Sequence, residues 1–210
     1  MTDTLDAPVR GDHPPPPAGR VSFEEFLAWC PENAWAEWVD GEIILMSPSN
    51  DEHQFVLNFL TRLISAFVEE HGLGWVFLPP FLMRLVTRPS GREPDLMFLA
   101  TEHGDRNRRT YIDGPADLVV EIVSPDSGAR DRGEKFVEYE QAGVPEYWVI
   151  DLVRQQASFY RLGEDGRYRP GPVDDGWYES AVLAGFRLRV DWLWQRPLPT
   201  IADVTRQLEA

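Results

Sequence analysis

The run of apolar residues around Glu121 constrains the fold more than any other part of this chain. Residues 116–123 read ADLVVEIV, so aliphatic side chains occupy both faces of a predicted strand. Such a strand belongs inside a sheet that is covered on both sides. An ionised carboxylate in its middle costs free energy unless a cation or hydrogen bonds compensate for it. Glu121 therefore needs a specific partner.

A second acid and a lysine lie where they could form a metal site with Glu121. Asp95 opens a similar run in PDLMFLA, and Lys135 lies on the helix predicted after the Glu121 strand. Two acids on neighbouring strands suit a hard cation such as Mg²⁺, which prefers oxygen ligands, and the main-chain carbonyl of Ile122 would add one more. The alternatives are that Glu121 pairs with an arginine or a helix N-terminus and that Asp95 is only a turn acid.

Length and composition predict one domain. The 210 residues are 43% hydrophobic, which is enough for a substantial core over residues 21–210. Residues 1–20 are rich in proline and small polar residues and read as a disordered tail without signal-peptide features. No apolar run is long enough to cross a membrane. The single cysteine, Cys30, excludes an internal disulfide framework and favours a cytoplasmic location, with Cys30 as an ordinary packing residue.

The charge balance argues against nonspecific binding of nucleic acid. The formal net charge is −15, whereas such binding usually rests on a broad basic surface. A local basic patch remains compatible with this balance, although solvated loops explain the same arginines. The candidates are Arg84, Arg88, Arg92, Arg106, Arg108 and Arg109.

Helical and turn signals are clear in the first half of the chain. Ser22 and Glu25 form a capping-box pattern that predicts a short helix. Asp40 and Gly41 predict the tight turn of a β-hairpin. Apolar residues at helical spacing predict a helix over residues 51–71, ended by Gly72.

Later segments predict strands around a further helix. GWVFLP, FLMRLV, PDLMFLA, PEYWVIDL, QASFYRL and residues 178–183 read as strands, residues 101–116 as irregular, and residues 201–208 as a last helix. Residues 126–143 predict a helix with Phe136, Val137 and Tyr139 as core contacts. The strand–helix–strand step over residues 117–151 implies parallel pairing. The fold class is therefore α/β, with a mixed sheet and helices on both faces.

The motifs in this order resemble a nuclease family. EPDLMFL, ADLVVEIVSPDS and RGEKFVEYEQAGVPEYWVIDL, together with AWAEWVDGEIILMSPSNDEHQFVLNFL, resemble the Uma-type restriction endonuclease family of the PD-(D/E)xK superfamily. Pro94 and Asp95 match the PD element, and Glu121 matches the following acid. The lysine expected two residues later is Val123 here. The resemblance implies a restriction-endonuclease-like mixed β-sheet flanked by helices.

The resemblance also implies roles for particular residues. Asp95 and Glu121 would bind Mg²⁺, or Mn²⁺ in its place, while Lys135 would take over the displaced lysine function and assist the water. Glu37 would be an additional acid, and Tyr139, which would share the helix face of Lys135, would contact the substrate. His53, early in the long helix, could contact substrate phosphate. The alternatives are Arg130 or Arg132 in place of Lys135, a solvated Glu37, a structural His53 and a packing role for Tyr139.

These residues predict a Mg²⁺-dependent endonuclease that hydrolyses nucleic acid, with DNA as the expected substrate. A homodimer is expected only by analogy with nucleases that cut two strands. The alternative is a nuclease-fold domain that binds or regulates without turnover. A weaker alternative is an acidic interaction protein whose carboxylates bind calcium.

Overall fold

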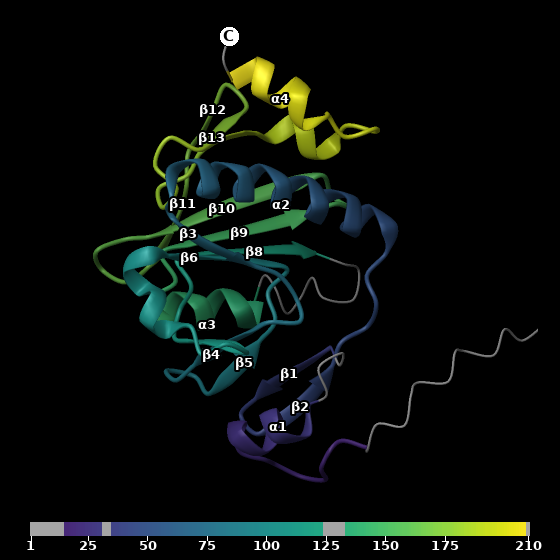
Figure 1. The fold of residues 1–210 in the computed structure, drawn as a ribbon, viewed down its shortest axis with the longest axis vertical. Helices are drawn as coiled ribbons and strands as arrows, with labels where there is room; N and C mark the ends of the chain where they lie inside the picture. Colours follow the sequence, from purple (N-terminus) through teal and green to yellow (C-terminus); the bar gives the residue numbers. More distant parts are fainter. Residues whose placement is uncertain (1–14, 31–34, 124–132, 209–210) are drawn as a thin grey trace, which may run out of the picture.

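Three β-sheets and their covering helices form stacked layers in the computed structural model, which describes residues 15–30, 35–123 and 133–208. Within these residues, the strand orders are β11-β10-β9-β8-β6-β3 in the central sheet, β2-β1-β5-β4-β7 in a second sheet and β12-β13-β14 in a small third one. The long helix α2 (Asp51–His71) lies across one face of the central sheet (Figure 1). The helix α3 (Lys135–Ala142) and the second sheet lie on the other face.

The remaining helical elements are α1 (Phe23–Trp29), η1 (Thr101–Arg106), η3 (Val190–Trp194) and α4 (Ile201–Leu208). The strands up to the site are β1 (Ala36–Val39), β2 (Glu42–Leu45), β3 (Gly74–Phe77), β4 (Leu82–Leu85), β5 (Ser90–Arg92), β6 (Leu96–Ala100), β7 (Tyr111–Asp113) and β8 (Leu118–Val123). The later strands are β9 (Glu146–Asp151), β10 (Gln156–Leu162), β11 (Tyr168–Pro170), β12 (Val173–Asp174), β13 (Trp177–Glu179) and β14 (Arg187–Arg189).

The Glu121 strand is β8, and it lies inside the central sheet as predicted. It pairs antiparallel with β6 and parallel with β9, so the predicted parallel step is confirmed. Leu118, Val120 and Ile122 point into the core under α2, because side chains alternate along a strand. Val119 and Val123 belong to the core on the opposite face. Glu121 shares that second face, which is the side of α3.

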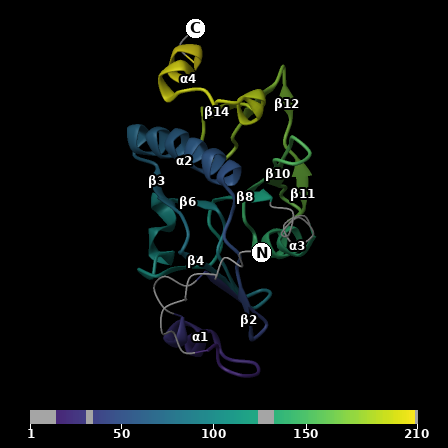
Figure 2. The same cartoon turned by 90° about the vertical axis from the view of Figure 1, so that its right-hand side faces the viewer.

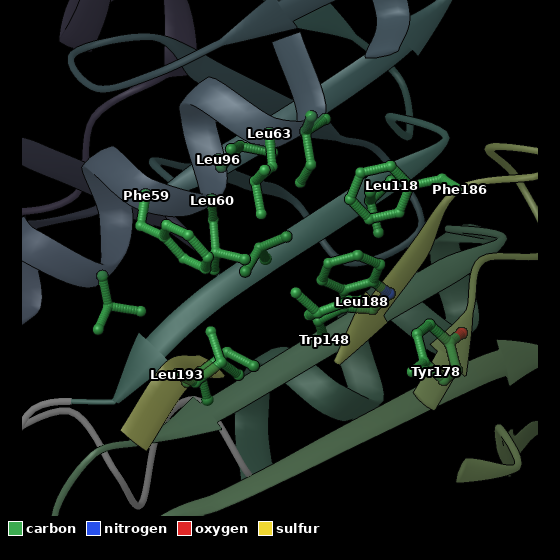
Figure 3. Close-up of a cluster of buried hydrophobic side chains, with 14 of the residues drawn as sticks. Phe59, Leu60, Leu63, Leu96, Leu118, Trp148, Tyr178, Phe186, Leu188 and Leu193 are labelled. Atoms are coloured by element: carbon green, nitrogen blue, oxygen red, sulfur yellow. The ribbon is translucent and has the colours of Figure 1, made fainter. Parts of the chain in front are cut away.

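The helix α2 has the predicted bounds and closes the first core. The Asn50 side chain caps its start by accepting a hydrogen bond from the His53 N–H, and Gly72 ends it at φ 62°. Its buried residues pack on β6, β8, β9 and the C-terminal segment, as Figure 3 shows for Phe59, Leu60 and Leu63. Phe55, although it is one of the apolar residues at helical spacing, is 57% exposed because it lies beyond the sheet-facing stripe.

The second sheet carries the N-terminal elements, seen from a second side in Figure 2. The capping box of Ser22 and Glu25 starts α1 as predicted, and the hairpin turn has Asp40 at φ 49° and Gly41 at φ 89°. Ala36 and Trp38 of β1 pack into a small core with α1. Glu37, between them, therefore points to the other face of the strand, toward the molecular interior.

Two strands that the sequence did not reveal complete this sheet. β5 falls between two predicted strands, in a segment where no element was predicted, and β7 falls in the segment predicted as irregular. Each is three residues long, so neither shows an alternating pattern. The position of Arg92 in β5 therefore went unrecognised.

Two further predictions need correction. Val137 is 41% exposed rather than a core contact, because Lys135, Glu138 and Tyr139 occupy the buried side of α3. Residues 126–132 of the predicted helix lie outside the described residues, and Gly143 ends α3 as predicted, at φ 84°.

The predicted strand 178–183 ends early, at Glu179. The N–H groups of Ala181 and Val182 donate to the buried carboxylate of Glu146 instead of to a strand. Within the described residues, no helix is long and apolar enough to cross a membrane.

The packing of α2 on the sheet predicts a strong contrast between two of its residues. Replacing the fully buried Leu60 by alanine should lower the free energy of unfolding by about 2–5 kcal/mol, because the cavity cannot close completely. The matched change Phe55→Ala, at a side chain that is 57% exposed, should alter it by no more than about 0.5 kcal/mol. Urea unfolding followed by tryptophan fluorescence measures both; equal losses would contradict the packing described here.

Candidate active site

Lys135, the first residue of α3, lies between two acids from different sheets. Its Nζ is 2.8 Å from Oε1 of Glu121 on β8 and 3.1 Å from Oε1 of Glu37 on β1. All three side chains are buried. The structure thus brings together three of the residues predicted from the sequence, although they are far apart along the chain.

Tyr139 follows Lys135 by one helical turn and contacts the same acid. Its hydroxyl donates a hydrogen bond of 2.9 Å to Oε1 of Glu121. Burial, and then the negative charge of Glu121, raise the pKa of Tyr139 well above its usual value. The hydroxyl therefore stays protonated and acts as a donor at neutral pH.

Arg92, which sequence reasoning did not assign to the site, links two of its buried acids. Arg92 of β5 is fully buried and donates two hydrogen bonds, of 2.8 and 2.7 Å, to Glu138 of α3. Its Nη1 donates a third, of 2.8 Å, to Oε2 of Glu37. Because Glu138 and Lys135 both lie on the buried side of α3, Arg92 and Glu37 connect this side of the helix to the second sheet at two points.

Asp95 lies just before β6 and contacts the strand that carries Glu121. Its Oδ2 accepts a hydrogen bond of 2.6 Å from the main-chain N–H of Ile122, and its Oδ1 is 3.1 Å from Nε2 of His53. Asp95 thus contacts the residue that follows Glu121 on β8, while a metal site shared by the two carboxylates stays a prediction. The contact of Ile122 is made by its N–H, while the predicted metal role of its carbonyl stays a prediction.

The positive charges around Glu37 oppose the effect of burial on its pKa. Burial alone would raise the pKa of Glu37, but the positive charges of Lys135 and Arg92 outweigh it and lower the pKa to about 2. The neighbouring Glu93 shows the opposite behaviour. Burial, followed by the charge of Glu37, raises the pKa of Glu93 to about 8. The site therefore keeps Glu37 ionised and favours a proton on Glu93 at neutral pH.

The donor set suits a hard divalent cation that keeps part of its hydration. Asp95 and Glu121 offer carboxylate oxygens, which are the ligands that Mg²⁺ and Mn²⁺ prefer. In the part of the chain that the structure describes, no three His, Cys, Asp or Glu side chains are grouped as a complete metal site. Mg²⁺ typically binds through one or two carboxylates, with waters and substrate oxygens completing the shell. The residues present fit that mode.

Part of the predicted basic patch is used in contacts within the protein, while Arg108 and Arg109 are exposed. Arg92 is buried in the site, and Arg106 donates to the Pro115 carbonyl at 2.7 Å. Arg84 lies 3.3 Å from a carboxylate oxygen of Glu24. These arginines therefore serve internal contacts or ion pairs as well as surface charge.

The sequence carries a further signal for Lys135, in addition to its position and the family resemblance. The chain contains 20 basic residues, and Lys135 is the only lysine among them. A sole lysine, fully buried and paired with two acids, is not explained by solubility or surface charge. For Arg92 no comparable signal exists, because its partners lie 46 and 55 residues away along the chain.

The structure is a mixed α/β fold in which acids from β8 and β1 meet the lysine of α3. The chain belongs to the family whose model is described as "Uma2: Putative restriction endonuclease", which matches residues 23–191. The predicted family and fold class are thereby confirmed, and nuclease function is supported at that general level.

Two individual proteins are similar to this chain. An uncharacterized protein of Synechocystis sp. is 26% identical over 155 residues, which cover 73% of this chain and 80% of that protein. The crystal structure of a putative nuclease of the DUF820 group from Anabaena variabilis superposes with a TM-score of 0.68 at 18% identity. That match covers 83% of this chain and 97% of the other. At this identity the likeness shows a shared fold.

The lowered pKa of Glu37 predicts an acid-sensitive fold. The folded-state pKa of about 2 lies below the ordinary value of 4.5, so the unfolded state takes up the proton first as the pH falls. The stabilisation from Glu37, about 3 kcal/mol, should be present above pH 4.5 and be lost progressively toward pH 2.

Urea unfolding in EDTA between pH 3 and pH 7 measures this dependence. Glu37→Gln should be less stable than the natural protein at pH 7 and should lose less stability on acidification. Glu42→Gln, a change at an exposed acid on the adjacent strand, should behave like the natural protein. An unchanged acid slope in Glu37→Gln would contradict the charge assignment.

Proposed function

We propose that this chain is a Mg²⁺-dependent endonuclease that hydrolyses phosphodiester bonds of nucleic acid, with DNA as its substrate. The observation that supports this most is the 2.8 Å contact between Lys135 and Glu121. The usual lysine position two residues after the acid is occupied by Val123, yet an ammonium group still reaches the carboxylate from α3.

Asp95 and Glu121 would hold the cation. When bound, Mg²⁺ would polarise the phosphodiester and make a water molecule a better nucleophile at neutral pH. The side chain of Asp95 is 19% exposed, compared with 4% for Glu121. Substrate would therefore approach from the side of Asp95, with Glu121 and Lys135 behind it.

The other residues would hold the reacting groups in place. Lys135 would present a fixed positive charge toward the phosphate, which stabilises negative charge that develops during hydrolysis. Glu37 holds the ammonium from the opposite side, and the Tyr139 hydroxyl fixes one oxygen of Glu121. Such fixed polar groups need little reorganisation during the reaction.

A second candidate is a nuclease-fold domain that binds or regulates without turnover. The net charge of −15 and the intramolecular contacts of Arg84, Arg92 and Arg106 favour it, because a nuclease must approach a polyanion. Homodimer formation and a cytoplasmic location are also proposals.

A cleavage assay separates the two candidates. Supercoiled, linear duplex and single-stranded DNA, and RNA, are incubated with the protein in Mg²⁺, Mn²⁺ or EDTA. Cleavage should require the metal and should fall by at least about a hundredfold in Asp95→Ala, Glu121→Ala and Lys135→Met. Glu102→Ala, a change at an exposed acid just after β6, should cleave like the natural protein.

Far-UV circular dichroism should confirm that each variant is folded. Cleavage that persists in EDTA, or that is equal in all variants, would come from a contaminant and would remove the support for an enzyme. Metal binding without cleavage of any substrate would favour the binding domain instead.

A further inference from the structure

His53 is buried at the start of α2, and its position is set by the helix cap. It is 6% exposed and lies in the first turn, where its N–H donates a 2.9 Å hydrogen bond to the Asn50 side chain. The cap fixes the backbone of this turn, and the ring points at Asp95, with 3.1 Å between Nε2 and Oδ1. The Asn50 cap therefore places the imidazole of His53 next to Asp95, the candidate metal ligand.

The second ring nitrogen favours one tautomer. Nδ1 of His53 is buried and has no hydrogen-bond partner among the described residues. A hydrogen on Nε2 would point at a carboxylate oxygen, which accepts it, and would leave only a lone pair on Nδ1. An unpaired buried lone pair costs less than an unpaired buried N–H. His53 is thus suited to donate one hydrogen bond, to Asp95.

Asp95 is held from both sides by this arrangement. His53 contacts Oδ1, while the N–H of Ile122 donates to Oδ2 at 2.6 Å. Two donors on different oxygens fix the plane of the carboxylate. Each oxygen has two lone pairs, so both retain the capacity to bind a cation.

We infer that His53 is a positioning residue for Asp95, and that it acts on the metal site through that carboxylate rather than by contacting substrate phosphate. This inference rests on the proposed function, because it assumes that Asp95 binds a divalent cation. Groups that hydrogen-bond to metal ligands orient them, and their loss typically lowers metal affinity about 10- to 100-fold.

Two substitutions separate positioning from simple packing. His53→Leu keeps most of the volume, removes the donor to Asp95 and removes the unpartnered Nδ1. The melting temperature of the metal-free protein should change only slightly, because the partly exposed Asp95 side chain keeps the Ile122 N–H and can accept a hydrogen bond from water. His53→Gln retains an N–H donor that can reach Asp95. His71→Leu, at an exposed histidine at the other end of α2, is the matched control.

Calorimetric titration of the full chain with MnCl₂ gives the readout, together with melting temperatures in EDTA. His53→Leu should bind Mn²⁺ about 10- to 100-fold more weakly than the natural protein. His53→Gln should recover most of the affinity, and His71→Leu should be unaffected. Asp95→Ala should lose binding at this site.

Each other result counts against a specific claim. Natural affinity in His53→Leu, with binding lost in Asp95→Ala, would overturn the role of His53 and leave the proposed function standing. Equal weakening in the Leu and Gln variants with lower melting temperatures, or failure of His53→Leu to fold, would show that His53 is a structural residue. Unchanged binding in Asp95→Ala, or no binding by the natural protein, would overturn both proposals.

Discussion

The ion pair of Lys135 with Glu121 and Glu37 is the interaction on which the site depends. It joins β8 of the central sheet and β1 of the second sheet to the first residue of α3, through contacts of 2.8 and 3.1 Å. Removing one partner of such a buried group typically costs about 3–5 kcal/mol, because the other charges stay buried without compensation. The two sheets and α3 are therefore held in one arrangement, which also fixes the atoms proposed to take part in catalysis.

Burial alone does not identify a functional acid in this fold. Glu146 at the start of the neighbouring strand is also fully buried, but it accepts hydrogen bonds from the Trp148 indole at 2.6 Å, the Tyr178 hydroxyl at 2.8 Å and main-chain N–H groups. These neutral donors tie the C-terminal segment to the central sheet. Glu121 instead contacts a lysine, and the next residue, Ile122, donates its N–H to a second carboxylate, that of Asp95. The nature of the partners separates the structural acid from the proposed metal ligand.

Local sequence patterns predicted the elements that are long or that have specific end residues. The helix over residues 51–71 and the hairpin turn at Asp40 agree with the structure because apolar spacing and turn residues act over short distances. The strands β5 and β7 are too short for such patterns, and the burial of Arg92 depends on acids that only the tertiary fold brings near. A shared site of Lys135 and Glu121 was predicted from their positions and from the family resemblance, but their direct contact was not. It also requires α3 to pack over β8, which spacing alone does not determine.

We propose that Asp95 and Glu121 bind a divalent cation beside Lys135. Anomalous scattering from crystals tests this metal site directly. Crystals grown without divalent metal and soaked in MnCl₂ should show a manganese peak within about 2.5 Å of carboxylate oxygens of both Asp95 and Glu121. Glu121→Ala crystals treated in the same way should lack that peak. Manganese peaks only at other residues, or no peak at these two carboxylates at saturating metal, would contradict the proposed metal site.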